Sequence, residues 1–319
     1  MNTFGNSFRL TVFGESHGVA IGVVIDGCPS GIALSENDFM PDLQRRKSGA
    51  RGTTSRKEDD IPRIVSGVYN GFTTGAPITI LFENNDVQSG NYEQFREIPR
   101  PGHADFVLSK KWNNFNDIRG GGYSSGRLTL TLVAAGVIAK KIISPVEINA
   151  VLVEAGGETC ISEMLEKAIA AGDSIGGIIS CTAKKLPIGL GSPFFNSVES
   201  LISHLVFSIP GVNGIEFGAG FGAAKMRGSE HNDCFISTDG KTATNNAGGI
   251  NGGITNGNEL IFRVSVKPTS SIACAQQTIN MQTNEMCELA IAGRHDACFA
   301  LRLPVIIEAV TAIALADLK

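Results

Sequence analysis

The chain has 319 residues, of which 42% are apolar and 18% charged, a composition that excludes a disordered chain and suffices for a large buried core. The formal net charge of −4 excludes a general attraction to nucleic acid or to acidic membranes. Seven scattered cysteines, none in a CxxC pair, argue against a disulfide framework or a metal site and favour a reducing compartment. We therefore expect a cytoplasmic protein without metal, membrane or nucleic-acid partners. No linker-like stretch divides the sequence, so a single domain over residues 1–319 is expected.

Hydrophobic periodicity and β-branched content predict alternating strands and helices without the regular spacing of a nucleotide-binding sheet. In chain order, the expected elements are strands at 8–13 and 20–26, a helix that begins after Ser35, strands at 64–69 and 77–82, helices at 104–113 and 125–143, a strand at 147–154, a helix at 162–171, a strand at 177–183, a helix at 197–207, a strand at 260–266 and a helix from about 297 to the end. This order predicts an α/β (α+β) fold in which mixed, largely antiparallel sheets pack around helices.

Three positions in these elements carry specific expectations. Ser35, followed three residues later by Asp38, is typical of a helix start. Pro304 lies inside the last expected helix and predicts a kink or an early break. His204 lies mid-helix between Leu201 and Leu205, and we expect it to be a buried core residue.

Three of the five histidines, His17, His103 and His231, lie in short polar or Gly-rich contexts. We interpret His231 as part of a loop, and a contact with substrate or cofactor is the alternative. His17 follows a predicted strand and stands next to Gly18, where an imidazole can exchange a proton near neutral pH. The alternative is a turn histidine that caps nearby carbonyls. His103 opens a predicted helix, whose unpaired N–H groups favour an anion. Asp105, in the first turn of that helix, suits the helix dipole and is equally compatible with a structural role.

Arginines and lysines cluster at 45–57, in a Gly/Thr/Ser-rich stretch that should be a loop. A solvated face is one interpretation of this cluster. The other is a site for a small polyanion, because the planar guanidinium binds phosphate and carboxylate with two hydrogen bonds. The acidic residues at 58–60 restore local neutrality and argue against a nucleic-acid tail. A Gly-rich segment at 119–127 precedes an apolar helix and can cradle a phosphate, although it lacks the GxxxxGK[ST] pattern.

Taken in order along the chain, the motifs resemble those of the chorismate synthase family. They are GESHG at 14–18, RPGHAD at 100–105, GYSSGRLT at 122–129, KPTSS at 267–271, and RHD at 294–296 followed by EA at 308–309. The resemblance implies a sandwich of sheets and helices, usually assembled as a homotetramer. It also implies conversion of 5-enolpyruvylshikimate 3-phosphate to chorismate and phosphate, the last common step of the shikimate pathway. The reaction is a redox-neutral 1,4-elimination that requires reduced flavin mononucleotide (FMN). An external reductase or an NADPH-linked system should supply the reduced flavin, because no nicotinamide-binding segment is left over.

The resemblance also implies roles for individual residues. His17 is expected to protonate the departing phosphate, His103 to lie at the N1–O2 edge of the flavin, and Asp296 to relay a proton near flavin N5. The residues expected to bind substrate are Arg46, Arg51, Arg127 and Arg294. The residues expected to bind the cofactor are Arg51, Arg56, Ser125, Gly126, Asn246, Ala247, Lys267 and Ser271.

The sequence departs from the family pattern at a few positions, chiefly Tyr123, where Arg is common, Leu128, where Glu is common, and Ala297, where Pro is common. An alternative function is therefore a flavin- or anion-binding relative with impaired turnover. A flavin-dependent redox enzyme is a second alternative, and it would oxidise nicotinamide stoichiometrically. For Asp296, the alternative to a catalytic role is a helix cap.

Overall fold

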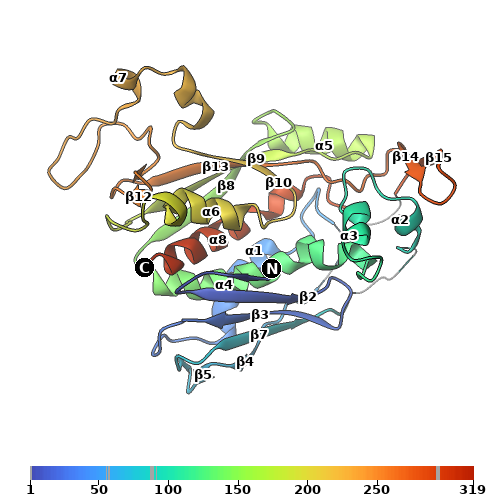
Figure 1. Cartoon of the computed structure of the whole chain (residues 1–319), viewed down its shortest axis with the longest axis horizontal. Coiled ribbons are helices and arrows are strands. Elements are labelled where there is room, and N and C mark those ends of the chain that lie inside the picture. The colour runs from blue at the N-terminus through green and yellow to red at the C-terminus, as the bar shows by residue number, and fades with distance from the viewer. Residues whose placement is uncertain (1, 55, 57, 87–89, 91, 292–294) are drawn as a thin grey trace.

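The computed structural model describes residues 2–54, 56, 58–86, 90, 92–291 and 295–319. Two antiparallel sheets enclose a layer of helices (Figure 1). The five-stranded sheet lies at the bottom of the view and the four-stranded sheet at the top. The long helices α4 (Thr129–Ile142) and α8 (Pro304–Asp317) lie between them. The expected α+β sandwich is thereby confirmed. Within the described residues, no helix is long and apolar enough to cross a membrane.

The five-stranded sheet has the order β1-β2-β3-β7-β4 and the four-stranded sheet the order β10-β13-β9-β8. Every neighbouring pair in both sheets is antiparallel. Their strands are β1 (Thr3–Phe4), β2 (Arg9–Gly14), β3 (Ala20–Asp26), β4 (Arg63–Ser66), β7 (Ile78–Glu83), β8 (Glu147–Ala155), β9 (Gly177–Lys184), β10 (Val212–Phe217) and β13 (Leu260–Val266). Three separate hairpins pair β5 (Val68–Tyr69) with β6 (Phe72–Thr73), β11 (Ile250–Asn251) with β12 (Ile254–Thr255), and β14 (Gln276–Asn280) with β15 (Glu285–Leu289).

Shorter helices surround the central pair. The α-helices are α1 (Met40–Arg46), α2 (Gln94–Glu97), α3 (Asp105–Lys111), α5 (Ile161–Ala171), α6 (Val198–Val206) and α7 (Gly228–His231). The 3-10 turns are η1 (Glu36–Phe39), η2 (Arg119–Ser124), η3 (Gly126–Leu128), η4 (Phe194–Asn196), η5 (Gly220–Lys225) and η6 (Phe299–Arg302).

Most predicted elements are confirmed to within about two residues at their ends, and two of them differ more. The strand expected at 64–69 is divided at Gly67, which adopts φ +81°. The helix expected at 125–143 begins only at Thr129, after the turn η3. The break predicted at Pro304 is real: Pro304 is the first residue of α8, where its missing N–H costs nothing, and η6 is a separate turn. The start after Ser35 is confirmed, because the Asp38 carboxylate accepts a hydrogen bond from the Ser35 backbone N–H at 2.7 Å.

The prediction that His204 is a core residue is wrong. The buried stripe of α6 runs through Leu201, Ile202 and Leu205. At 100° per residue, position 204 lies roughly 60° outside that stripe. His204 is therefore exposed, and its ring contacts the edge of Phe4 with 5.3 Å between ring centroids.

The central helices are mostly apolar, and the two sheets cover them. Residues 305–317 of α8 are all buried. Gly136 of α4 lies at the closest approach of the two helices, since a Cβ there would stand 2.4 Å from the Ala309 Cβ. This close contact holds the middle of α4 against α8, and the amino end of α4 carries part of the pocket described below.

We expect Gly136→Ala to destabilise the fold by about 1–3 kcal/mol, because overpacking between α4 and α8 outweighs the better helix propensity of alanine. Urea denaturation of the purified chain measures this change. The double variant Gly136→Ala/Ala309→Gly removes the clashing Cβ of the partner helix and should recover part of the loss. An unfolding midpoint that does not change in Gly136→Ala would contradict the close packing.

Candidate active site

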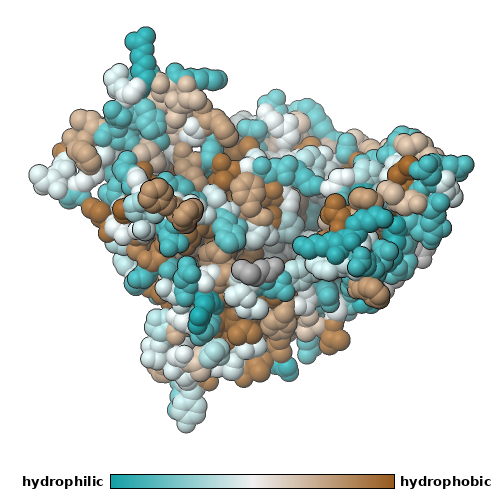
Figure 2. Space-filling view, in the orientation of Figure 1, coloured by the Kyte–Doolittle hydropathy of each residue, from teal (hydrophilic) through white to brown (hydrophobic). Residues whose placement is uncertain are grey.

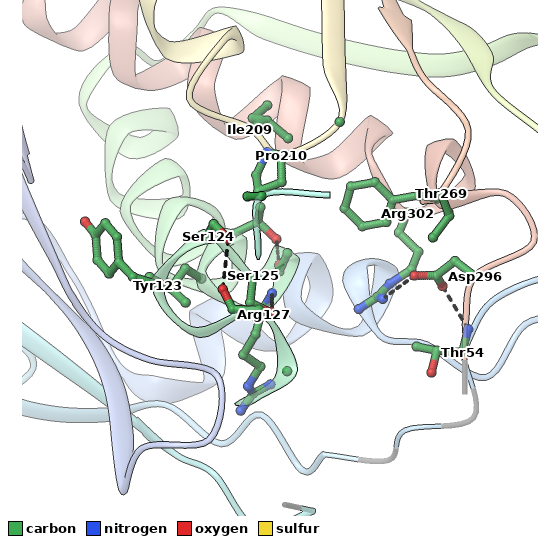
Figure 3. A pocket seen from close by; sticks show the side chains of 18 of the residues that line it. Thr54, Tyr123, Ser124, Ser125, Arg127, Ile209, Pro210, Thr269, Asp296 and Arg302 are labelled. Atoms are coloured by element: carbon green, nitrogen blue, oxygen red, sulfur yellow. Dashed lines mark hydrogen bonds and ion pairs between the residues drawn. The ribbon is translucent and has the colours of Figure 1, made fainter. Parts of the chain in front are cut away.

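A pocket of about 1340 Å³ opens beside the amino end of α4, where segments far apart in the sequence meet. Figure 3 shows Ser124, Ser125 and Arg127 on one side, Asp296 and Arg302 on another, and Ile209 and Pro210 above them. Among the described lining residues, arginines and lysines outnumber carboxylates. The pocket therefore favours an anionic ligand. Its lining contains these sequence-predicted residues: His17, His103, Asp296, Arg46, Arg56, Arg127, Ser125, Gly126, Lys267 and Ser271.

Four of the predicted residues are not placed in this pocket. Arg51 is exposed and forms an ion pair with Glu166 of α5. The backbone N–H groups of Asn246 and Ala247 donate to the Asp233 carboxylate at 2.8 and 2.9 Å, beyond the end of β10. Arg294 lies outside the described residues. The roles expected for these four residues stay predictions.

His17 is buried in the turn between β2 and β3, where its ring meets the edge of Tyr92 with 5.3 Å between centroids. The neighbouring Gly120 has φ +57°, and a Cβ there would stand 2.2 Å from His17 Cε1. Only glycine fits at this point, because any side chain would occupy the space of the imidazole.

His103 faces the next residue of the same Gly-rich segment. A Cβ on Gly121, which has φ +83°, would lie 3.8 Å from His103 Cε1 and Nε2. The Gly120–Gly121 pair thus forms a thin wall with one imidazole against each residue. The sequence predicts that this segment can cradle a phosphate; in the structure the His17 ring fills the space beside Gly120, whereas His103 leaves room for a Cβ at Gly121.

Arg46 and Arg127 are buried side by side and share one carboxylate. Asp60 accepts from Arg46 Nη1 at 3.3 Å and from Arg127 Nη1. Arg46 also donates to the carbonyl oxygens of Gly126 and Arg127, at 3.1 and 3.2 Å. Both guanidinium groups are therefore fixed in place before any ligand arrives, which suits recognition of an anion of defined shape.

The charge of Arg46 is affected by its surroundings. Burial lowers the pKa of Arg46 to about 9, the positive charge of Arg302 acts in the same direction, and Asp60 opposes both. Arg46 remains a cation at neutral pH. An anionic ligand would reduce the repulsion between Arg46 and Arg302.

Arg56 connects the arginine loop to the turn that carries His17. It donates from Nη1 to Ser16 Oγ at 3.0 Å and from Nη2 to the Ser16 carbonyl at 3.2 Å. Glu58 accepts from Arg56 Nη2 at 2.6 Å and holds the guanidinium from the other side. The arginine cluster at 45–57 is therefore divided: Arg46 and Arg56 line the pocket, and Arg51 lies on the surface.

Asp296 lies between Thr54 and Arg302 (Figure 3). Its Oδ1 accepts from the Thr54 backbone N–H at 2.8 Å, and its Oδ2 forms an ion pair with Arg302 Nη1 at 3.5 Å. Asp296 caps no helix: the residue before η6 is Cys298, and the residue before α8 is Leu303. The capping alternative is therefore wrong, and the carboxylate, held by Thr54 and Arg302, lines the pocket.

Lys267 lies on another side of the pocket with two serines. Its Nζ donates to the Gly102 carbonyl at 2.6 Å and to Ser270 Oγ at 3.2 Å. Ser271 Oγ accepts from Arg100 Nη1 at 3.0 Å. This group of cations and hydroxyls lies close to His103, which follows Gly102 directly.

Sequence reasoning did not predict several charged residues of the pocket, among them Asp60 and Arg302. Asp60 belongs to the acidic run at 58–60, which we interpret from the sequence as restoring local neutrality and as evidence against a nucleic-acid tail. Its position next to an arginine cluster was the signal that could have indicated a carboxylate partner for the arginines. Arg302 carries no local signal, because it reaches Asp296 and the Arg46 carbonyl only in the folded chain.

Comparisons with known proteins agree with this arrangement. A family model described as chorismate synthase matches residues 8–319. A chorismate synthase from Chitinophaga pinensis is 62% identical over 318 residues, which cover 99% of this chain and 96% of that protein. One from Dehalococcoides mccartyi is 44% identical over 349 aligned positions, covering 99% and 96%. A crystal structure of a chorismate synthase superposes with a TM-score of 0.74 at 25% identity, covering 98% of this chain and 92% of the other.

Proposed function

The chain belongs to the chorismate synthase family, and we propose that its pocket holds reduced FMN and the phosphorylated substrate together. The family acts as a carbon–oxygen lyase and converts 5-enolpyruvylshikimate 3-phosphate to chorismate and phosphate. In this 1,4-elimination phosphate leaves from one carbon, a hydrogen leaves from another, and a new carbon–carbon double bond forms. The observation that carries the proposal is the gathering of His17, His103 and Asp296 around one cation-rich pocket.

The residues of the pocket suit a flavin phosphate and a flat ring. Lys267, Ser270 and Ser271 offer a cation and hydroxyls at one side. The Gly120–Gly121 wall keeps side chains away from the centre of the pocket. Ser125 and Gly126 line the floor beside the amino end of α4. When bound, reduced FMN would supply an electron-rich ring that assists the departure of phosphate in a reaction without net redox change.

The substrate carries two carboxylates and a phosphate, and we assign their binding to the fixed guanidinium groups. Arg46 and Arg127 are held by Asp60 with their side chains at the pocket wall. Arg56 lies beside the His17 turn, so it would bind an anionic group next to that imidazole. His17 would then donate a proton to the departing phosphate. Asp296 would accept and pass on a proton at its carboxylate, and His103 would take up a proton at Nε2 and give it back there.

We also propose that residues 1–319 act as one catalytic domain in a homotetramer in the cytoplasm. Support for the assembly comes from large apolar side chains that remain exposed in two segments, at 188–195 and 221–236. Phe194 is 86% and Phe195 91% exposed, and Phe221 is 83% exposed. Figure 2 shows apolar side chains in tan and brown over the upper-left lobe, around α7 and β12. Such surfaces are typical of subunit contacts.

Anaerobic incubation of the purified chain with reduced FMN and 5-enolpyruvylshikimate 3-phosphate should release chorismate and phosphate in equal amounts. Flavin affinity, followed by the absorbance of the bound cofactor, should increase when the substrate is present, because both would share the pocket. Stoichiometric oxidation of nicotinamide would indicate a redox enzyme instead. Binding of flavin and substrate without release of phosphate would indicate a binding relative.

A further inference from the structure

His103 has a buried carboxylate partner that its proposed role does not yet use. Asp105, the first residue of α3, lies with Oδ1 2.7 Å from His103 Nδ1. The carboxylate is almost fully buried, with only 1% of its side chain exposed, while the imidazole is 23% exposed toward the pocket. A carboxylate at this distance accepts a hydrogen bond from the ring nitrogen and orients the ring.

Asp105 is itself locked by Arg100. The guanidinium donates from Nε to Oδ2 and from Nη2 to Oδ1, both at 2.7 Å. Burial raises the pKa of Asp105, but the hydrogen bonds from Arg100 and His103 outweigh burial and hold it well below its usual range. The carboxylate therefore stays ionised and can only accept hydrogen bonds. Arg100 is fixed in turn by Ser271 Oγ at 3.0 Å and by the Phe95 ring, 4.4 Å from its guanidinium carbon.

This arrangement decides which nitrogen of His103 faces the pocket. An ionised Asp105 can only accept, so its contact of 2.7 Å favours a proton on Nδ1. Arg100 Nη2 lies 3.1 Å from the same Nδ1 and can only donate, which favours the opposite tautomer; Nη2 already donates to Asp105 Oδ1 at 2.7 Å, and the shorter contact to the carboxylate decides for Nδ1–H. Nε2 is then the atom open to a ligand, on the ring edge that faces Gly121. Lys267, which donates to the Gly102 carbonyl, is another charged side chain close to this segment.

We propose that Asp105 is the positioning residue of His103: it holds the proton on Nδ1 and aims Nε2 into the pocket, with Arg100 as its anchor. Asp105 acts only through His103 and does not itself contact a ligand. The proposal rests on the proposed function in one respect, the role of His103 as a proton-carrying group.

The first measurement is the protonation pattern of the imidazoles in the full-length chain labelled with ¹⁵N-histidine. With five histidines in the sequence, the His103 signals can be assigned by their loss in His103→Gln. We expect neutral His103 to carry its proton on Nδ1. Asp105→Ala should convert it to the Nε2–H form or to a mixture, and Asp105→Asn, which keeps an acceptor oxygen, should retain much of the Nδ1–H form.

The second measurement is steady-state turnover of the same variants. By analogy with partners that orient functional histidines, Asp105→Ala should lower kcat by about 10- to 100-fold with little change in KM, and Asp105→Asn should lie in between. Asp38→Ala is a matched control, because Asp38 is also a first-turn aspartate paired with a basic residue, Lys141, and does not line the pocket. It should leave both the His103 signals and kcat unchanged.

The outcomes separate this proposal from the proposed function. If neutral His103 in the unsubstituted chain carries its proton on Nε2, the positioning proposal is overturned, and this measurement needs no variant to fold. An unchanged Nδ1–H tautomer in a folded Asp105→Ala variant would also overturn it. Full turnover in His103→Gln together with the expected tautomer would instead overturn the proposed role of His103.

Discussion

His17→Ala is expected to lower turnover by about 10²–10⁴-fold, the usual contribution of a positioned general acid. The reason is geometric. The imidazole is buried against Tyr92 and Gly120, and Arg56 donates a hydrogen bond to the side chain of the adjacent Ser16. A group in that place can protonate phosphate while Arg56 binds its charge. Phosphate release at saturating reduced FMN and substrate measures the effect.

The control for His17→Ala is another histidine outside the pocket. His231 ends the short helix α7 and does not line the pocket, so His231→Ala should keep full turnover. Circular dichroism and a thermal melt of both variants show whether they remain folded. Turnover close to that of the unsubstituted chain in a folded His17→Ala variant would contradict the acid role of His17.

Asp296→Asn should lower turnover by about 10²-fold or more, because an amide cannot carry the exchanged proton. Asparagine keeps an oxygen that can accept from the Thr54 N–H, so the loop at 49–54 should stay in place and both ligands should still bind. The expected result is therefore loss of phosphate release with retained flavin and substrate affinity, measured on one preparation together with its thermal melt.

A second substitution separates the carboxylate from its ion pair. Arg302→Gln breaks the same contact to Asp296 but leaves the carboxylate in place. It should lower turnover much less than Asp296→Asn does. Equal losses in the two variants would mean that the ion pair, and not proton transfer at Asp296, accounts for the effect. Full activity of Asp296→Asn would remove Asp296 from the mechanism.

Much of the fold follows from local patterns. Alternation of apolar residues predicted strands such as β3 and β13, whose inward positions are buried, because period-two patterning is a property of the strand itself. Pro304 placed the start of α8 for a similarly local reason. The strand β10 and the hairpin β14–β15 were missed, because their short, mixed sequences become strands only by pairing with neighbours. His204 was misplaced because burial on α6 depends on which side meets α8.

By itself, the sequence determined the kind of site: histidines in Gly-rich turns, an arginine cluster, and motifs in the order of the family. These are signals of residue type and near neighbours. Only the tertiary structure decided which arginines face the pocket, since Arg46 and Arg56 line it whereas Arg51 pairs with Glu166. It also joined Asp296 to the Thr54 N–H, 242 positions away, and Arg302 to the Arg46 carbonyl, 256 positions away. Contacts over such separations depend on how the two sheets pack against the central helices, and no local pattern encodes them.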